Sequence, residues 1–217
     1  MENRRSVFTL LCALLCGGAL AQSIGIVSST AVPLPSAPDA AHELRLAVYL
    51  FEGTRWEPGQ ALAALALAAP VLAKCAIAVS AELHVLRAPR RFRTLFTPDS
   101  RELLRELAPP RPALFLVEDT RNRPAFDAEA VGRGNSRTRP EMVNTVWVTF
   151  GTPDLPLVLA HELSHLLADS GEHSSEPGNL MREETAPENT RLTETQCNVI
   201  RTRGAIGGLI TPRMVKP

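Results

Sequence analysis

The chain has 217 residues, of which 45 % are hydrophobic and 21 % charged, a composition that is typical of globular proteins and sufficient for one domain. Lysine plus arginine and aspartate plus glutamate balance at 23 each, so the chain lacks the basic excess that non-specific binding to nucleic acid or anionic membranes requires. We therefore expect no nucleic acid and, after export, no membrane among its partners.

The N-terminus has the pattern of a secretory signal peptide. Arg4 and Arg5 give it a charged start, residues 7–20 form an apolar run, and Ala19 and Ala21 are the small residues that a cleavage site needs. The apolar run is shorter than the roughly 20 residues that span a bilayer, which argues against a transmembrane anchor. We predict a signal peptide over residues 1–21 and a secreted or periplasmic protein.

The remaining chain divides into a leader and a folded domain. Residues 22–41 are rich in serine, alanine and proline without an apolar period, so we expect a flexible leader there and a single domain over residues 42–217. Apolar or β-branched runs predict strands at residues 44–51, 77–86, 113–117 and 145–150. Periodicity and breaker residues predict helices at residues 59–73, 99–107, 155–168 and 193–203.

The alternation of these elements indicates the α/β class, a mixed twisted sheet with helices packed on it. Between the third and fourth strands, residues 119–141 are polar and are expected to be loop with one weak strand at most. Asp154 is expected to cap the helix over 155–168. Thr193 and Gln196 have the spacing of a capping box for the last helix.

Two cysteines, Cys75 and Cys197, remain once the signal peptide is removed. An exported chain with two cysteines most simply forms one disulfide, which here would join an early element to the C-terminal segment. Two buried thiols are the alternative.

The helix over 155–168 carries the sequence HELSH, with His161, Glu162 and His165. Residues four apart lie on one helix face, so both imidazoles can reach a common ion, and zinc binds such nitrogens at about 2.0–2.1 Å. Glu162 is one position round the helix and would stand beside the ion, where it can act as a general base. The alternative is an exposed helix with a solvated His-Glu-His face.

A catalytic zinc needs a third protein ligand, which cannot come from the same helix. Asp169 lies eight residues after His161, about 12 Å along the axis. Gly171 permits the chain to turn back, which makes His173 the first candidate. Glu183 and Glu184 are rivals, since they follow at the distance where the gluzincin family supplies a glutamate.

The segment resembles the metzincin family of zinc metallopeptidases, in which a histidine pair on a helix is followed by a third histidine and a loop centred on methionine. As in the matrixin branch, Met181 lies eight residues after His173. The resemblance implies Zn²⁺ held by His161, His165 and His173, with Met181 as an apolar floor below them. It also departs from the family, because Ala168 replaces a glycine and the connection to His173 is two residues longer.

These observations predict an exported zinc endopeptidase that acts on peptides or proteins as a monomer, with Glu162 as the base. Related enzymes bind extended peptide along an edge strand, which would fall near Gly132 and Gly134, although Gly-Arg-Gly is also a plain turn. The alternative function is a non-hydrolytic zinc-binding or interaction module that keeps the metalloprotease architecture.

Overall fold

The computed structural model describes residues 23–122, 130–133 and 140–213, and the predicted signal peptide over 1–21 lies outside them. Within these ranges, no helix is both long enough and apolar enough to cross a membrane. The described residues form four α-helices and nine strands, in the order β1 (Gly25–Val32), β2 (His42–Phe51), α1 (Pro58–Ala73), β3 (Ile77–Arg87), β4 (Thr94–Leu95), α2 (Thr97–Leu107), β5 (Ala113–Val117), β6 (Asp119–Thr120), β7 (Ala130–Arg133), β8 (Thr145–Thr149), α3 (Leu155–Ala168), α4 (Glu194–Ile206) and β9 (Ile210–Pro212).

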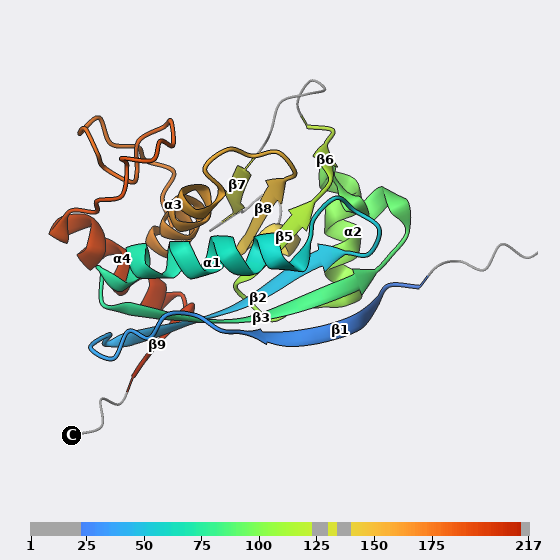
Figure 1. The fold of residues 1–217 in the computed structure, drawn as a ribbon, viewed down its shortest axis with the longest axis horizontal. Coiled ribbons are helices and arrows are strands. Elements are labelled where there is room, and N and C mark those ends of the chain that lie inside the picture. The colour runs from blue at the N-terminus through green and yellow to red at the C-terminus, as the bar shows by residue number, and fades with distance from the viewer. Residues whose placement is uncertain (1–22, 123–129, 134–139, 214–217) are drawn as a thin grey trace, which may run out of the picture.

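The main sheet is mixed and twisted, as predicted (Figure 1). Its strands lie in the order β1-β3-β2-β5-β8-β7. The short strand β9 pairs with the beginning of β2, whereas β5 pairs with a later part of β2. The inner strands β3, β2, β5 and β8 are parallel to one another, whereas β1, β7 and β9 are antiparallel to their neighbours. Strands β4 and β6 form a separate pair. Parallel neighbours require long crossover connections. Helix α1 lies in the connection from β2 to β3 and α2 in that from β3 to β5, whereas the connection from β5 to β8 contains β6 and β7.

Both faces of the sheet are covered, and β2 shows why. Its side chains alternate, so that Leu46 and Val48 join the core under α1 and α3, whereas Ala47 and Tyr49 join the core under α2. Figure 1 shows α1 lying across the sheet with α3 beside it. A strand buried on both faces reads as a continuous apolar run. This explains the dense sequence over 44–51 that predicted it.

The expected flexible leader is wrong for most of its length. Residues Gly25–Val32 form β1, which pairs antiparallel with β3 at one edge of the sheet. Most of its side chains are exposed, so its sequence shows no apolar period. Its backbone nevertheless pairs with β3 along its length, with one register shift between Ile26 and Ser28. The β-branched residues Ile26, Val27, Thr30 and Val32 were the signal that composition obscured.

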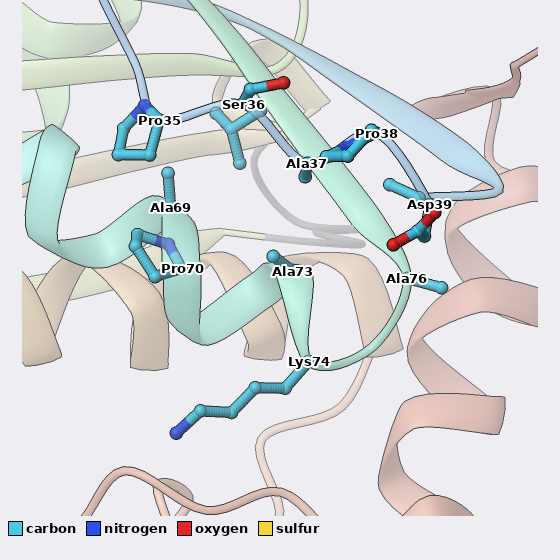
Figure 2. Close-up of a pocket in the computed structure, with 12 residues that line it drawn as sticks. Pro35, Ser36, Ala37, Pro38, Asp39, Ala69, Pro70, Ala73, Lys74 and Ala76 are labelled. Atoms are coloured by element: carbon cyan, nitrogen blue, oxygen red, sulfur yellow. The ribbon is translucent and has the colours of Figure 1, made fainter.

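The rest of the leader packs on the second half of α1. Figure 2 shows the segment from Pro35 to Asp39 facing Ala69, Pro70 and Ala73 across a pocket of about 380 Å³. The folded part of the chain therefore extends N-terminal to the predicted domain boundary at residue 42.

The predicted disulfide between Cys75 and Cys197 is confirmed, with the two Cα atoms 4.9 Å apart. Both cysteines are buried, one just after α1 and the other in the first turn of α4. The bond therefore ties the end of α1 to the helix that follows the candidate site.

Candidate metal centre

Helix α3 presents the HELSH sequence from a buried position. Pro156 lies in its first turn, where the missing N–H does no harm, and Leu159, Leu163 and Leu167 pack into the core. Asp154 is the N-cap residue as predicted, but its side chain makes no capping hydrogen bond; its carbonyl oxygen accepts from Leu157 and Val158 instead. The apolar side of the helix thus fixes the direction in which the polar residues point.

The chain begins to reverse before Gly171, the residue that was expected to permit the turn. Asp169 adopts the left-handed conformation that ends the helix, with φ of 49°, because aspartate tolerates this region better than most residues. The Ser170 N–H then donates to the carbonyl of His165. The chain reverses here and leads to His173.

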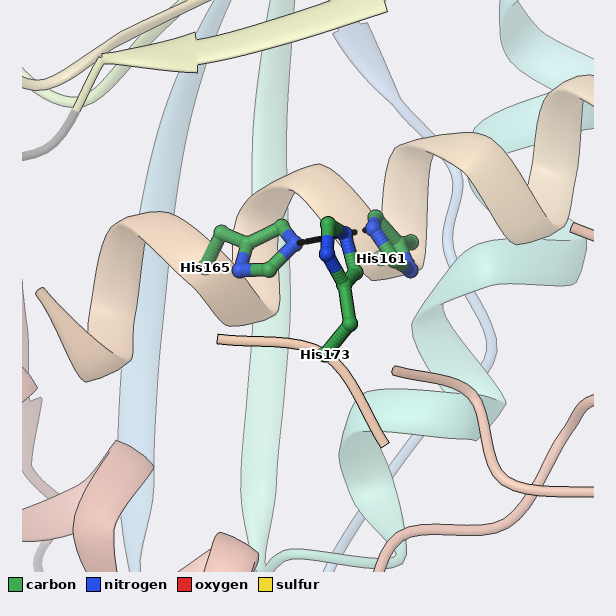
Figure 3. Close-up of side chains that lie close together, drawn as sticks. All are labelled: His161, His165 and His173. Carbon is green, nitrogen blue, oxygen red and sulfur yellow. Dashed lines mark hydrogen bonds between the residues drawn. The ribbon is translucent and has the colours of Figure 1, made fainter. Parts of the chain in front are cut away.

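Three imidazoles meet at one point, and their coordinating nitrogens all lie within 4.8 Å of one another (Figure 3). The Nε2 atom of His165 lies 2.9 Å from Nε2 of His161 and 3.2 Å from Nε2 of His173. Figure 3 shows that two of the rings project from α3 and the third from the loop beyond it. The structure therefore places His173, and neither Glu183 nor Glu184, beside the helical pair.

The main chain sets the proton positions on two of the rings. Nδ1 of His161 lies 2.8 Å from the carbonyl oxygen of Leu180, and Nδ1 of His165 lies 2.8 Å from that of Ser170. A carbonyl can only accept, so each Nδ1 carries the proton and each Nε2 presents a lone pair. Two lone pairs facing each other cannot hydrogen-bond, but both can bind one cation.

The donor set fits zinc. Two nitrogens bound to a tetrahedral zinc at roughly 2.0–2.1 Å are about 3.3 Å apart. Nε2 of His165 lies at similar distances, 2.9 Å and 3.2 Å, from Nε2 of His161 and of His173. Imidazole is also a donor that zinc prefers. His161 is buried, His165 is half-buried and His173 is exposed, so the site is closed by protein on one side and accessible on the other.

Burial also keeps the helical pair neutral. It lowers the pKa of His161 from its ordinary value, and His173 adds to the effect. Burial and the neighbouring His161 lower the pKa of His165 to about 4. A protonated imidazole cannot bind metal, so these residues remain competent ligands well below neutral pH.

Two further predicted residues lie at the site. Glu162 follows His161 on α3 and is half-buried. Met181 is buried at 6 % exposure within the core that includes α3, and its carbonyl accepts a 2.7 Å hydrogen bond from the N–H of Ser174. The methionine thus lies in the core, and its main chain closes the loop that starts after His173.

Sequence reasoning missed the groups that orient the rings. The carbonyls of Ser170 and Leu180 are main-chain acceptors. Because any residue type supplies such a carbonyl, no residue pattern predicts them. Asn179 was also missed, although the Pro-Gly-Asn sequence before Met181 is typical of a turn whose asparagine bonds the backbone two residues on. Its Oδ1 does accept from the Met181 N–H, at 2.9 Å.

No protein-family model matches the chain, and no curated protein matches it in sequence. Among solved structures, it is similar to the crystal structure of metalloproteinase-II from Bacteroides fragilis, with a TM-score of 0.50 and 17 % identity. The match covers 78 % of this chain and 55 % of that one, so this chain spans about half the length of that protein. The likeness shows the fold, a metalloproteinase-like mixed α/β architecture with helices packed on the sheet.

Proposed function

We propose that this protein is an exported zinc-dependent endopeptidase of the metzincin type. The observation that carries the proposal is the convergence of three Nε2 atoms, from His161, His165 and His173, of which two are held as lone-pair donors by main-chain carbonyls. These residues would hold the ion. The metalloproteinase-like fold supports the same assignment.

Zinc, when bound, would polarise the scissile carbonyl and lower the pKa of a bound water towards 7. The carboxylate of Glu162 is assigned the role of general base and then general acid: it accepts a proton from the attacking water and delivers it to the leaving amine. Met181 supports the rings from below. The chain's single tyrosine, Tyr49, is buried on the α2 side of the sheet, so a tyrosine is not assigned to the oxyanion.

The substrate is proposed to be an extended peptide. Among the described residues, strand β7 pairs antiparallel with β8 and is the last strand on that side of the sheet. Figure 1 shows it close to α3. An edge strand of this kind can hydrogen-bond an added strand. We assign the backbone around Gly132 to this role.

The deciding experiment is Glu162→Gln in the purified chain. Zinc content should stay stoichiometric while hydrolysis of a mixed peptide library is lost, because the variant keeps the ligands and removes the base. Glu176→Gln, which changes an exposed glutamate of the following loop, is the matched control and should leave both unchanged.

Two outcomes would contradict the proposal in different ways. A wild-type chain that binds zinc but hydrolyses no member of the library would be a binding module. A wild-type chain that binds no zinc, or a His173→Ala variant with undiminished zinc affinity, would overturn the ligand set itself.

A further inference from the structure

Residues 179–181 contact the candidate metal centre at two places. The carbonyl of Leu180 accepts the 2.8 Å hydrogen bond from Nδ1 of His161. The carbonyl of Met181 accepts from the N–H of Ser174, the residue after His173. The position of this three-residue stretch therefore influences two of the three imidazoles at once.

A pair of side-chain amides, one buried and one half-buried, holds the stretch. Asn179 is 3 % exposed, and its Nδ2 donates to Oε1 of Gln196 at 3.0 Å while its Oδ1 accepts from Nε2 of Gln196 at 3.2 Å. Backbone donors fix both amide orientations, because the N–H of Met181 donates to Oδ1 of Asn179 and that of Thr193 donates to Oε1 of Gln196. Each amide oxygen is thus identified by a group that can only donate.

The partner of Asn179 belongs to a firmly anchored helix. Gln196 is the third residue of α4 and completes its capping box with Thr193. The next residue, Cys197, is bonded to Cys75 at the end of α1. Arg191, just before this helix, adds two main-chain hydrogen bonds: its carbonyl accepts from the N–H of Leu180, and its N–H donates to the carbonyl of Gly178.

We propose that Asn179 and Gln196 form an amide latch that positions the zinc site, by fixing the Leu180 carbonyl where His161 needs it. This inference rests on the metal site assigned under the proposed function. Without the latch, the carbonyl no longer selects the tautomer of His161 that has its proton on Nδ1. The other tautomer has its proton on Nε2, the atom that must bind the ion. Both latch residues are positioning residues, since neither touches the ion.

Gln196→Glu tests the latch with little disturbance of the helix. A glutamate keeps the oxygen that accepts from Thr193 and Asn179, and glutamate is itself favoured at this place in a capping box. Its second oxygen, however, faces Oδ1 of Asn179, where two acceptors repel each other. The matched control is Thr193→Ala, which removes the hydroxyl that accepts from the Gln196 N–H but leaves the amide pair.

The first readout is zinc affinity by competition with a chelator. Loss of a group that orients a metal ligand typically weakens metal binding about 10–100-fold, and we expect Gln196→Glu to fall in this range while Thr193→Ala stays near wild type. The second readout is ¹⁵N NMR of the metal-free protein at pH 8. There the Nδ1-protonated fraction of His161 should drop in Gln196→Glu and be retained in the control.

Equal effects of the two variants on zinc affinity, or an unchanged His161 tautomer in Gln196→Glu, would overturn the latch. If Gln196→Glu does not fold, Gln196→Ala takes its place with the same two readouts. A wild-type chain that binds no zinc would refute the proposed function, yet the tautomer measurement on metal-free protein would still decide the latch. Absence of peptide hydrolysis with zinc bound leaves both readouts intact.

Discussion

Removal of the disulfide should lower the free energy of unfolding by several kcal/mol. The bond joins Cys75 to Cys197 across 122 positions of sequence. In the chain-entropy description, closing a loop of 122 residues removes about 16 cal/mol/K from the unfolded chain, which is about 5 kcal/mol at 25 °C. Measured effects of native disulfides are usually about 2–5 kcal/mol, so we expect a loss of about 3–5 kcal/mol.

The assay is urea denaturation of the double variant Cys75→Ala, Cys197→Ala with EDTA present, because a bound metal would add its own stabilisation. Reduced wild-type protein is the control, since it keeps both sulfur atoms in the core and loses only the cross-link. A difference below about 1 kcal/mol between oxidised and reduced protein would refute the entropic reasoning.

Four further outcomes are expected. Met181→Ala should lower the free energy of unfolding by about 2–4 kcal/mol, as for other buried methionines, and should weaken zinc binding. The control is Leu67→Ala, at a residue that is 63 % exposed. It should change neither the free energy of unfolding nor zinc affinity in parallel titrations. The pKa of His165 is lowered from 6.5 to about 4 in the folded chain. As pH falls, the unfolded chain therefore binds a proton at this residue before the folded chain does. Urea titrations of metal-free protein should show that the free energy of unfolding decreases between pH 6.5 and pH 4. Metal analysis should show zinc loss as pH falls below about 4, where His165 becomes protonated even in the folded chain, and stoichiometric zinc at about pH 3 would contradict the ligand set. N-terminal sequencing of exported protein should begin at Gln22, whereas retention of residues 1–21 would exclude the predicted cleavage.

Much of the architecture could be predicted because its signals are local. The strand β2 and the helix α3 have mostly apolar sequences, and His161 and His165 share a helix face by spacing alone. Prediction of His173 as the third imidazole depended on an assumed reversal of the chain after the helix. In the structure this reversal begins at Asp169 and not at Gly171.

What the sequence did not reveal depends on main-chain groups or distant partners. Strand β1 was missed because it lies at the sheet edge with most side chains exposed, so backbone pairing defines it. The pairing of Asn179 with Gln196 joins residues 17 positions apart through the packing of a loop on α4. No local period encodes such a contact.

Ser170 explains how this site tolerates a longer connection to its third imidazole. Its N–H and its carbonyl both bond His165, the first through the main chain and the second through the ring, and its hydroxyl accepts from the N–H of Glu172. Ser170 therefore ends the helix, orients the ring of His165 and begins the turn towards His173. The additional residues after Ser170 do not have to orient that ring. A site of this kind is better recognised by main-chain carbonyls that accept from Nδ1 of two histidines than by a fixed number of residues between the histidines.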